Sequence, residues 1–278
     1  MRVAYQGERG AFSESAARRL LGPEITSVAC RSFEEMFASV PQGEADCCVA
    51  PIENSLAGSI HRNYDLLLES ALTVAGETSL RIMHSLIARP GVALEEIRRV
   101  YSHPVALAQC TRFLRAHPDI EPMPVHDTAG AVRMVIEGGR NDEAGIASAA
   151  AAEIYGGNVL LDSVEDNAQN FTRFLLLVPL DDAGSITPLE PARRWKTSII
   201  LRVPNKPGAL FRALGAFAIF EIDLSKIESR PIEGRPWEYA FYLDFIGKRD
   251  DPNVARALDS LRELAEMVRV LGSYPTRW

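Results

Sequence analysis

The sequence predicts an α/β fold with parallel-rich sheets for roughly the first 180 residues, followed by a smaller module of four strands and two helices. Strand and helix patterns alternate through the first part, which is typical of strands that run parallel. The stretch 181–194 is polar and broken by prolines, as in a linker. Beyond it the patterns follow the order βαββαβ. A chain of 278 residues is long enough for two domains, each with its own core.

The composition argues against several classes of protein. Thirty basic and 37 acidic residues give a formal charge of −7 without a lysine- or arginine-rich run, which disfavours binding to nucleic acid or to an anionic membrane surface. No apolar stretch approaches the ~20 residues that a membrane span needs. The chain opens on a strand pattern without a signal peptide, and its four cysteines and five histidines lack metal-binding spacings. We therefore expect reduced thiols, no metal site and a cytoplasmic location.

The first elements alternate between strand and helix. Ser13 is the expected N-cap of the first helix, because its side chain can accept a hydrogen bond from a free backbone N–H. The glycine loop before it does not match G-x-G-x-x-G, so a dinucleotide site is not favoured. We expect strands at 2–6 and 46–50, helices at 13–21 and 33–40, and a third helix with Ile60, Tyr64, Leu67 and Leu68 on its apolar face.

The following elements continue the alternation. Ser102 is the expected cap of a helix at 105–115. Ser148 opens an alanine-rich helix that the glycines at 156–157 end. We also expect one long strand at 80–88, a helix through Val132, Val135 and Ile136, a strand at 143–147, and a buried strand at 171–178 that Pro179 closes.

Polar side chains stand at the entrance of the last of these strands. Asn170, Thr172 and Arg173 adjoin an apolar run, and a buried polar group must find a partner. Other strand ends open onto helix starts rich in Ser, Thr or Asn, where free backbone N–H groups attract anions. Ligands of open α/β sheets bind beyond the carboxyl ends of the strands. Together these features predict a cleft for a small, multiply anionic molecule, although helix capping or a structural ion pair explains each one alone.

The last part of the chain predicts a ferredoxin-like arrangement. The expected strands lie at 197–203, 224–230, 239–246 and 268–274, and the expected helices lie at 209–220 and 252–267. This part has no cysteines and no row of base-stacking aromatic residues, so neither an iron–sulfur cluster nor RNA binding is favoured.

Short motifs span nearly the whole chain, and their order and combination are highly specific. They are Gly7-Glu8-Arg9-Gly10-Ala11-Phe12-Ser13, the segment 51–60, Ser102-His103-Pro104, Asp127-Thr128-Ala129-Gly130-Ala131, Ala147-Ser148, the segment 170–174, Pro207-Gly208-Ala209-Leu210 and Glu228-Ser229-Arg230-Pro231. In these motifs the chain resembles monofunctional prephenate dehydratases with a C-terminal ACT regulatory domain. The resemblance implies a two-lobed, periplasmic-binding-protein-like catalytic domain at 1–180, with lobe 1 at about 1–78 and 160–180 and lobe 2 at about 79–159. It also implies a linker at 181–194 and a ferredoxin-like ACT domain at 195–278.

The resemblance implies a carbon–oxygen lyase that converts prephenate to phenylpyruvate in phenylalanine biosynthesis, with loss of carbon dioxide and of the ring hydroxyl. It places Thr172 as general acid or hydrogen-bond donor, Arg173 as the guanidinium that binds a carboxylate, and Phe174 behind that arginine. A purely structural role for Arg173 stays open. Further expected substrate contacts are Asn54, Ser55, Ser102, Thr128, Ser148 and Asn170. No metal or organic cofactor is implied, because acid catalysis and electrostatics suffice for these bond changes.

The C-terminal motifs imply feedback regulation, because in the family they meet across a dimer of ACT domains and bind phenylalanine. A homodimer or homotetramer is therefore expected. The expected effector contacts are Gly208, Ala209, Leu210, Glu228, Ser229, Arg230 and Pro231. Two residues depart from the pattern: Val105 stands where many relatives have Gln, and Asp223 where they usually have Asn. The alternatives are an arogenate dehydratase and a non-catalytic two-lobed ligand-binding or amino-acid-sensing protein.

Overall fold

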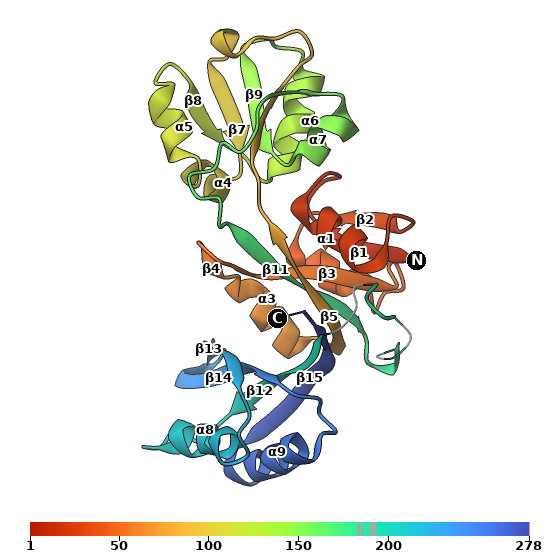
Figure 1. Ribbon diagram of the computed structural model, residues 1–278, viewed down its shortest axis with the longest axis vertical. Coiled ribbons are helices and arrows are strands. Elements are labelled where there is room, and N and C mark those ends of the chain that lie inside the picture. Colours follow the sequence, from red (N-terminus) through yellow and green to blue (C-terminus); the bar gives the residue numbers. More distant parts are fainter. Residues whose placement is uncertain (183, 185, 190–192, 278) are drawn as a thin grey trace. The chain divides into compact units, whose positions relative to one another are not determined.

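Figure 1 shows the computed structural model of the chain, in which residues 1–182, 184, 186–189 and 193–277 are described. The predicted linker at 181–194 lies partly outside the described residues. The described helices are α1 (Phe12–Leu21), α2 (Phe33–Ser39), α3 (His61–Glu69), α4 (Pro104–Ala108), α5 (Thr111–Ala116), α6 (Thr128–Gly138), α7 (Ala149–Tyr155), α8 (Ala209–Ile219) and α9 (Pro252–Leu264), with 3₁₀ turns at Leu94–Glu96 and Leu180–Asp182.

The described strands of the first sheet follow the order β2-β1-β3-β11-β5, with β4 paired to β3. They are β1 (Arg2–Gln6), β2 (Thr26–Cys30), β3 (Cys47–Asn54), β4 (Gly58–Ser59), β5 (Leu72–Arg81) and β11 (Phe171–Pro179). Strand β1 pairs in parallel with both β2 and β3. This arrangement follows the βαβ order of the sequence, because each helix crossover returns the chain to the same end of the sheet.

The described strands of the second sheet follow the order β10-β6-β9-β7-β8. They are β6 (Ser85–Ala88), β7 (Arg99–Ser102), β8 (Glu121–Pro124), β9 (Glu143–Ala147) and β10 (Asn158–Leu161). Strand β7 pairs in parallel with β8 and β9, whereas β6 pairs antiparallel with β9 and β10. The sheets of this part are therefore mixed, and the α/β class that the sequence predicts is confirmed.

The chain divides into two compact units, one of Met1–Ser59 and Ser79–Phe174 and one of Ile60–Thr78 and Leu175–Trp278. Strands β5 and β11 each continue from one unit into the other along the chain. The domain boundaries given above, at 180 and 195, stay predictions.

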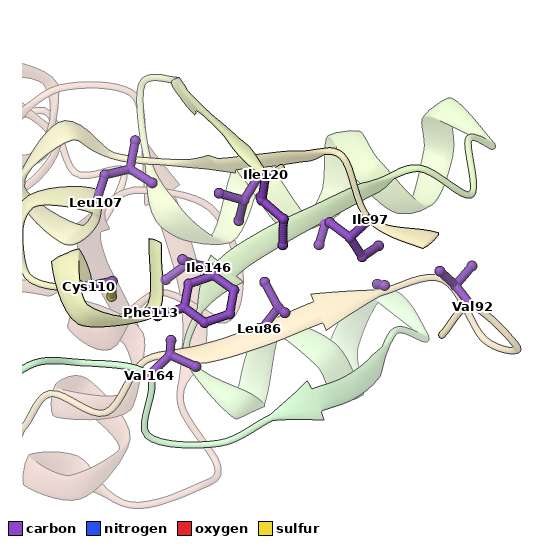
Figure 2. Packing of buried hydrophobic residues seen from close by; sticks show 12 residues of the cluster. Leu86, Val92, Ile97, Leu107, Cys110, Phe113, Ile120, Ile146 and Val164 are labelled. Carbon is purple, nitrogen blue, oxygen red and sulfur yellow. The ribbon is translucent and has the colours of Figure 1, made fainter. Parts of the chain in front are cut away.

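The first unit has apolar cores on both faces of its second sheet. Figure 2 shows Leu86 and Ile146 of that sheet packed with Phe113 of α5, in a cluster that also holds the buried thiol of Cys110. A second cluster joins residues from β1 and the start of α1 to α6, β9 and α7. These are Tyr5, Ala11, Ile87, Ala129, Val132, Ala147, Ala151 and Ala152. The first unit is thus one packed body, and the two-lobe division expected from the sequence stays a prediction.

Four local expectations were wrong. The single strand expected at 80–88 is broken at 82–84, because the backbone N–H of Ile82 donates to the carbonyl of Asn170 and the chain then enters the second sheet. The helix expected at 105–115 consists of α4 and α5. The N-cap of α4 is His103, whose ring accepts from the N–H of Val105, and not Ser102. Helix α1 begins at Phe12, so Ser13 lies inside it.

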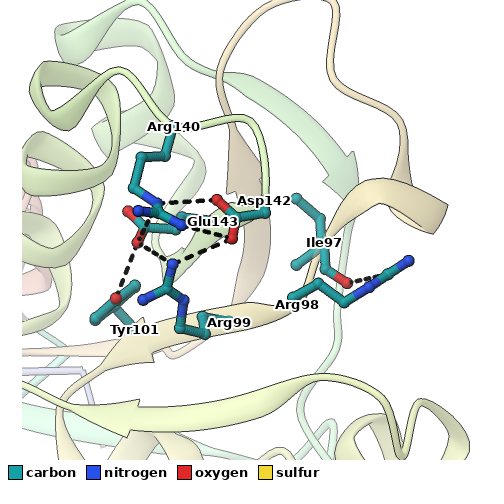
Figure 3. A network of polar contacts seen from close by, with 7 residues as sticks. All are labelled: Ile97, Arg98, Arg99, Tyr101, Arg140, Asp142 and Glu143. Carbon is teal, nitrogen blue, oxygen red and sulfur yellow. Dashed lines mark hydrogen bonds and ion pairs between the residues drawn. The ribbon is translucent and has the colours of Figure 1, made fainter.

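A charged network ties β7 to the start of β9 in the first unit. Figure 3 shows Arg99 and Arg140 meeting at Asp142, with Nη2 of each within 3.0–3.1 Å of Asp142 Oδ2. Tyr101 donates to Glu143 Oε1 at 3.1 Å. Hydrogen bonds from Arg140 and then Arg99 hold the pKa of Asp142 well below its usual range. The carboxylate is therefore charged throughout the neutral pH range.

The second unit contains an antiparallel sheet whose described strands follow the order β13-β14-β12-β15. They are β12 (Arg194–Arg202), β13 (Leu224–Ile232), β14 (Arg235–Ile246) and β15 (Met267–Thr276). Helices α8 and α9 cover one face of this sheet (Figure 1), and their core includes Phe217, Phe245, Leu258 and Leu261. This is the ferredoxin-like arrangement that the sequence predicts, and it is confirmed.

The opposite face of this sheet is polar and packs against α3 and the first part of β5, all within the second unit. Lys196 Nζ lies 2.6 Å from Glu77 Oε1, and both side chains are buried. Tyr242 donates to the carbonyl of Tyr64 at 2.6 Å, and Arg269 donates to the carbonyls of Leu68 and Ser70. A buried ion pair of this kind fixes how two surfaces meet, since breaking it strands a charge in the interior.

Candidate active site

The site is built where the end of β3 meets the start of β11 in the first unit. Asn54 ends β3 and Thr172 lies at the second position of β11, and both are buried. Asn54 Nδ2 donates to Asn170 Oδ1 at 2.8 Å and to Thr172 Oγ1 at 2.9 Å. The sequence separates these partners by more than a hundred positions, so the fold alone brings them together.

The orientation of the Asn54 amide is fixed by the backbone. Its Oδ1 accepts hydrogen bonds from the N–H groups of Leu56 and Ala57, at 3.0 and 2.8 Å. An N–H can only donate, so this atom must be the oxygen and the other must be the nitrogen. Both hydrogens of that nitrogen are then used, one on Asn170 and one on Thr172.

This geometry determines what the Thr172 hydroxyl can do. Its oxygen accepts from Asn54, so its own hydrogen must point elsewhere. Among the described residues, Thr172 Oγ1 takes part in a single hydrogen bond, the one that it accepts from Asn54. Thr172 is therefore a buried hydroxyl whose hydrogen has no acceptor among the described residues.

Two side chains outside the motifs of the sequence, Gln109 and His84, extend this network. Asn170 Nδ2 donates to Gln109 Oε1 at 2.9 Å, and His84 Nε2 lies 3.1 Å from the same oxygen. Gln109 is half-buried at the C-cap of α4, and His84 is buried between β5 and β6. In the described part of the chain, the two N–H donors of Gln109 have no hydrogen-bond partner. Neither Gln109 nor His84 belongs to a motif, and only their polar side chains among apolar neighbours in the sequence could have indicated a role at the site.

Ser55 braces the same junction. Its hydroxyl donates to the carbonyl of Gln169 and accepts from the N–H of Phe171, both at 2.9 Å, while its N–H donates to the carbonyl of Phe171 at 2.8 Å. Three hydrogen bonds thus clamp the loop after β3 to the start of β11. This placement fits a role in positioning the strand that carries Thr172.

Two other residues expected at the site lie on the second sheet or its helices. Ser102 is fully buried and donates to the carbonyl of Ile146 at 2.6 Å. Thr128 is the first residue of α6, whose N-cap Asp127 accepts from Gly130 N–H at 2.6 Å. The structure does not bring Ser102 or Thr128 into hydrogen-bond contact with Thr172 among the described residues.

Ser148 joins the two sheets of the first unit. Its hydroxyl donates to the carbonyl of Gly10 at 2.6 Å and accepts from the N–H of Ala151 at 3.3 Å as the N-cap of α7. Gly10 has φ +84°, and a Cβ there would lie 2.8 Å from the backbone of Ala151. Glu14 Oε2 accepts from the N–H of Gly10 at 2.7 Å. The glycine loop of the first motif therefore contacts the start of α7 and requires a glycine at position 10.

The remaining residues of the strand motif alternate across β11. Thr172 and Phe174 share one face of the strand, and Arg173 points to the other. Phe174 is 1% exposed and belongs to the core, whereas Arg173 is half-buried. Phe174 therefore lies on the same face as Thr172 and not behind Arg173, and the role of Arg173 stays a prediction.

The residues expected to bind the effector lie in the second unit. Gly208 is the N-cap of α8 with φ +75°, and Ala209 and Leu210 follow it in the helix. On β13, Arg230 forms two hydrogen bonds to the Asp65 carboxylate of α3, at 2.9 and 2.8 Å. Glu228 Oε1 lies 3.3 Å from His61 Nε2 at the start of the same helix.

The alternate residues of this motif, Ser229 and Pro231, are exposed. The motif thus has one face on α3 and one face open, and its role in effector binding stays a prediction.

The described residues contain no group of histidine, cysteine, aspartate and glutamate side chains that could hold a metal ion. Within the same residues, no helix is long and apolar enough to cross a membrane.

Comparison with known proteins places these features in context. Residues 3–180 match the family model for prephenate dehydratase, and residues 197–263 match that for the ACT domain. The chain is 44% identical over 286 residues to arogenate dehydratase/prephenate dehydratase 2 of Arabidopsis thaliana, which covers 99% of this chain and 73% of that relative.

Solved structures that resemble the chain over 99% of its length include two that are more than 30% identical to it. One is a prephenate dehydratase from Arthrobacter aurescens in complex with L-Phe, with 33% identity, a TM-score of 0.89 and 90% of that chain covered. The other, GqqA, is described as a novel type of quorum quenching acylase, with 36% identity, a TM-score of 0.88 and 98% of that chain covered.

Proposed function

The chain belongs to the prephenate dehydratase family and is a dehydratase, that is, a carbon–oxygen lyase of aromatic amino acid biosynthesis. From this premise we propose that it converts prephenate to phenylpyruvate and that Thr172 donates to the oxygen that leaves. In this reaction the bond between the ring carbon and its hydroxyl oxygen breaks, and the ring carboxylate leaves as carbon dioxide. The electrons of the broken carbon–carbon bond enter the ring, which becomes aromatic. The departing hydroxide takes up a proton and becomes water.

The direction of the Thr172 hydroxyl carries the proposal. Hydroxide is a poor leaving group, and a hydrogen bond or proton delivered to it as charge develops lowers the barrier. Asn54 donates a hydrogen bond to the hydroxyl oxygen of Thr172, which leaves the hydroxyl hydrogen for the substrate. An arrangement in which Thr172 donated to a neighbouring carbonyl would have spent that hydrogen.

Gln109 supplies the second element of the proposal. Its Oε1 is linked to Thr172 by hydrogen bonds through Asn170 and Asn54, which leaves its Nε2 donors for a ligand in the proposal. Amide N–H groups suit a substrate carboxylate or carbonyl and add no charge to the site. We assign Gln109 and Asn54 to the polar wall of the site, with Asn170 linking them.

The decisive experiment follows phenylpyruvate absorbance after the purified protein is mixed with prephenate. Turnover by the wild type together with a loss of about 10²–10⁴-fold in Thr172→Val supports the proposal, because valine keeps the shape of threonine without its hydroxyl. Thr172→Ser, which keeps the hydroxyl, is the matched control and should retain most of the activity. Near-normal turnover by Thr172→Val would remove this residue from the mechanism.

Arogenate is the second candidate substrate, because the Arabidopsis relative is named for both compounds. Arogenate carries an amino group where prephenate has a keto oxygen. An ammonium group requires an acceptor, whereas a keto oxygen requires a donor such as the Gln109 amide nitrogen. The ratio of kcat/KM on the two substrates decides between them, and a larger value on arogenate would replace prephenate in the proposal.

We further propose that phenylalanine inhibits the enzyme through the C-terminal domain. The similar structure from Arthrobacter aurescens is a complex with L-Phe, and the Gly208 turn before α8 allows a ligand close to the backbone. The proposed oligomer, a homodimer or homotetramer, would cover exposed apolar side chains of this domain. These are Phe211, Ile219, Ile227 and Trp237. Unchanged prephenate kinetics at saturating phenylalanine would contradict the regulation, and a monomeric mass in solution would contradict the assembly.

A further inference from the structure

His84 lies at the far end of the hydrogen-bonded chain that leads to Thr172, and its position is fixed from several sides. Its N–H donates to Glu165 Oε2 and its carbonyl accepts from Val164 N–H, both at 2.9 Å. Its ring and that of Phe12 form a T-shaped pair, with centroids 5.7 Å apart and planes at 80°. His84 is 2% exposed, so other parts of the protein enclose its ring.

The hydrogen-bonded chain also determines the tautomer of His84. The backbone N–H groups of Leu56 and Ala57 show which amide atom of Asn54 is the oxygen, because that atom accepts from them. Asn54 Nδ2 then donates to Asn170, so the Asn170 atom that it meets is the oxygen. Asn170 Nδ2 in turn identifies the oxygen of Gln109. An amide oxygen can only accept, so the ring atom 3.1 Å away, His84 Nε2, must carry a hydrogen.

The other ring nitrogen supports a neutral imidazole. His84 Nδ1 is buried and has no hydrogen-bond partner among the described residues. A second N–H on that atom would be stranded in the interior. Burial accordingly lowers the pKa of His84, against smaller opposing effects of the Gln109 hydrogen bond and the Glu165 charge.

We propose that His84 is a positioning residue: its Nε2–H locks the Gln109 amide so that the Nε2 donors of Gln109 face the substrate. The inference rests on the proposed function. Gln109 Oε1 accepts two hydrogen bonds, one from Asn170 and one from His84. An amide rotated by 180° would place its own hydrogens against both of these donors. Two donors therefore hold the orientation more firmly than one.

Without the His84 donor, Gln109 loses one of its two restraints. The net worth of one such hydrogen bond corresponds to about a tenfold change in an equilibrium constant. We therefore expect His84→Phe to lower kcat/KM by about tenfold, mostly through KM, because the Gln109 donors bind the substrate before the bond breaks. Phenylalanine keeps the aromatic contact with Phe12 and removes the donor.

Rescue and coupling separate positioning from a structural effect. His84→Gln can return an N–H donor near the place of Nε2 and should recover most of the loss. In a Gln109→Leu background, His84→Phe should lower kcat/KM by less than twofold, since the residue through which His84 acts is gone. A full tenfold loss in that background, or no recovery in His84→Gln, would overturn the proposal.

A measurement independent of activity completes the test. Imidazole ¹⁵N and ¹³C chemical shifts of the full-length protein should report His84 as the neutral Nε2–H tautomer at pH 7. A neutral Nδ1–H form or an imidazolium would overturn the inference even if the enzyme is active. Conversely, if the protein shows the Nε2–H tautomer but is inactive on prephenate and arogenate, the proposed function is refuted, whereas the hydrogen bond from His84 to Gln109 is confirmed.

Discussion

Replacing Asn54 with aspartate turns the donor that sets the direction of the Thr172 hydroxyl into an acceptor. The two side chains have nearly the same shape, and an aspartate oxygen can still accept from Leu56 and Ala57 N–H as Asn54 Oδ1 does. The other position, Nδ2 in the wild type, becomes an oxygen that can only accept. Thr172 would then donate to the carboxylate at position 54 and have no hydrogen left for the substrate.

The size of the effect follows from this geometry. A positioned proton donor is worth about 10²–10⁴-fold in turnover, or about 3–5 kcal/mol of barrier. Asn54→Asp should therefore lower kcat nearly as much as Thr172→Val. The unfolding free energy should fall by only about 1–3 kcal/mol, the usual loss when a buried acceptor such as Asn170 Oδ1 lacks its donor.

The assay is prephenate turnover for both single variants and the double variant, with urea unfolding to check the fold. If the loss arises because Thr172 donates to the new carboxylate, Asn54→Asp should lower kcat little further in the Thr172→Val background. If repulsion between the new carboxylate and an anionic substrate causes it, the full loss should persist there. That second outcome, or near-normal turnover by Asn54→Asp, would refute the reasoning.

Three further predictions follow from the described contacts. Glu77→Ala should lower the unfolding free energy by about 3–5 kcal/mol in urea, because it leaves Lys196 charged and buried. Asp142→Asn should destabilise the protein at pH 7 and progressively less below about pH 4, as measured by urea midpoints, because a carboxyl with a lowered folded-state pKa loses its stabilisation on protonation. Asp65→Asn should weaken phenylalanine inhibition several-fold while uninhibited turnover stays within twofold, because it loosens the Arg230 pair between β13 and α3.

Each of the three has a matched control. The double variant Glu77→Ala, Lys196→Met should regain most of the lost stability, and failure to do so would assign the loss to packing. A destabilisation by Asp142→Asn that is constant from pH 7 to pH 2 would contradict the titration. Asp259→Asn removes an exposed ion pair with Arg262 on α9 and should leave inhibition unchanged. An equal change in both variants would contradict the role of Asp65.

The sequence by itself determined the order of the elements. The strands at β1, β9 and β11, the helices from α6 to α9 and the βαββαβ order of the C-terminal module follow from apolar periodicity and caps, which are local properties. The motif at β11 also identified Thr172 as the hydroxyl to examine. Strands β2, β4, β8 and β10 were missed, because they are short and only partly buried and their pattern resembles that of loops. Most of β5 was also missed, although it is long and buried.

The tertiary structure alone decided which polar groups meet. Ser102 and Ser148 look alike in the sequence, yet one hydroxyl is enclosed against Ile146 and the other holds the Gly10 loop. Gln109 and His84 carry no motif, and only the break between β5 and β6 brings His84 to the Gln109 oxygen. A hydrogen bond has a direction that depends on every donor and acceptor nearby, and those neighbours come from distant parts of the chain. Periodicity along the chain can place a side chain on a face, but it cannot tell whether a hydroxyl there still has a proton to give.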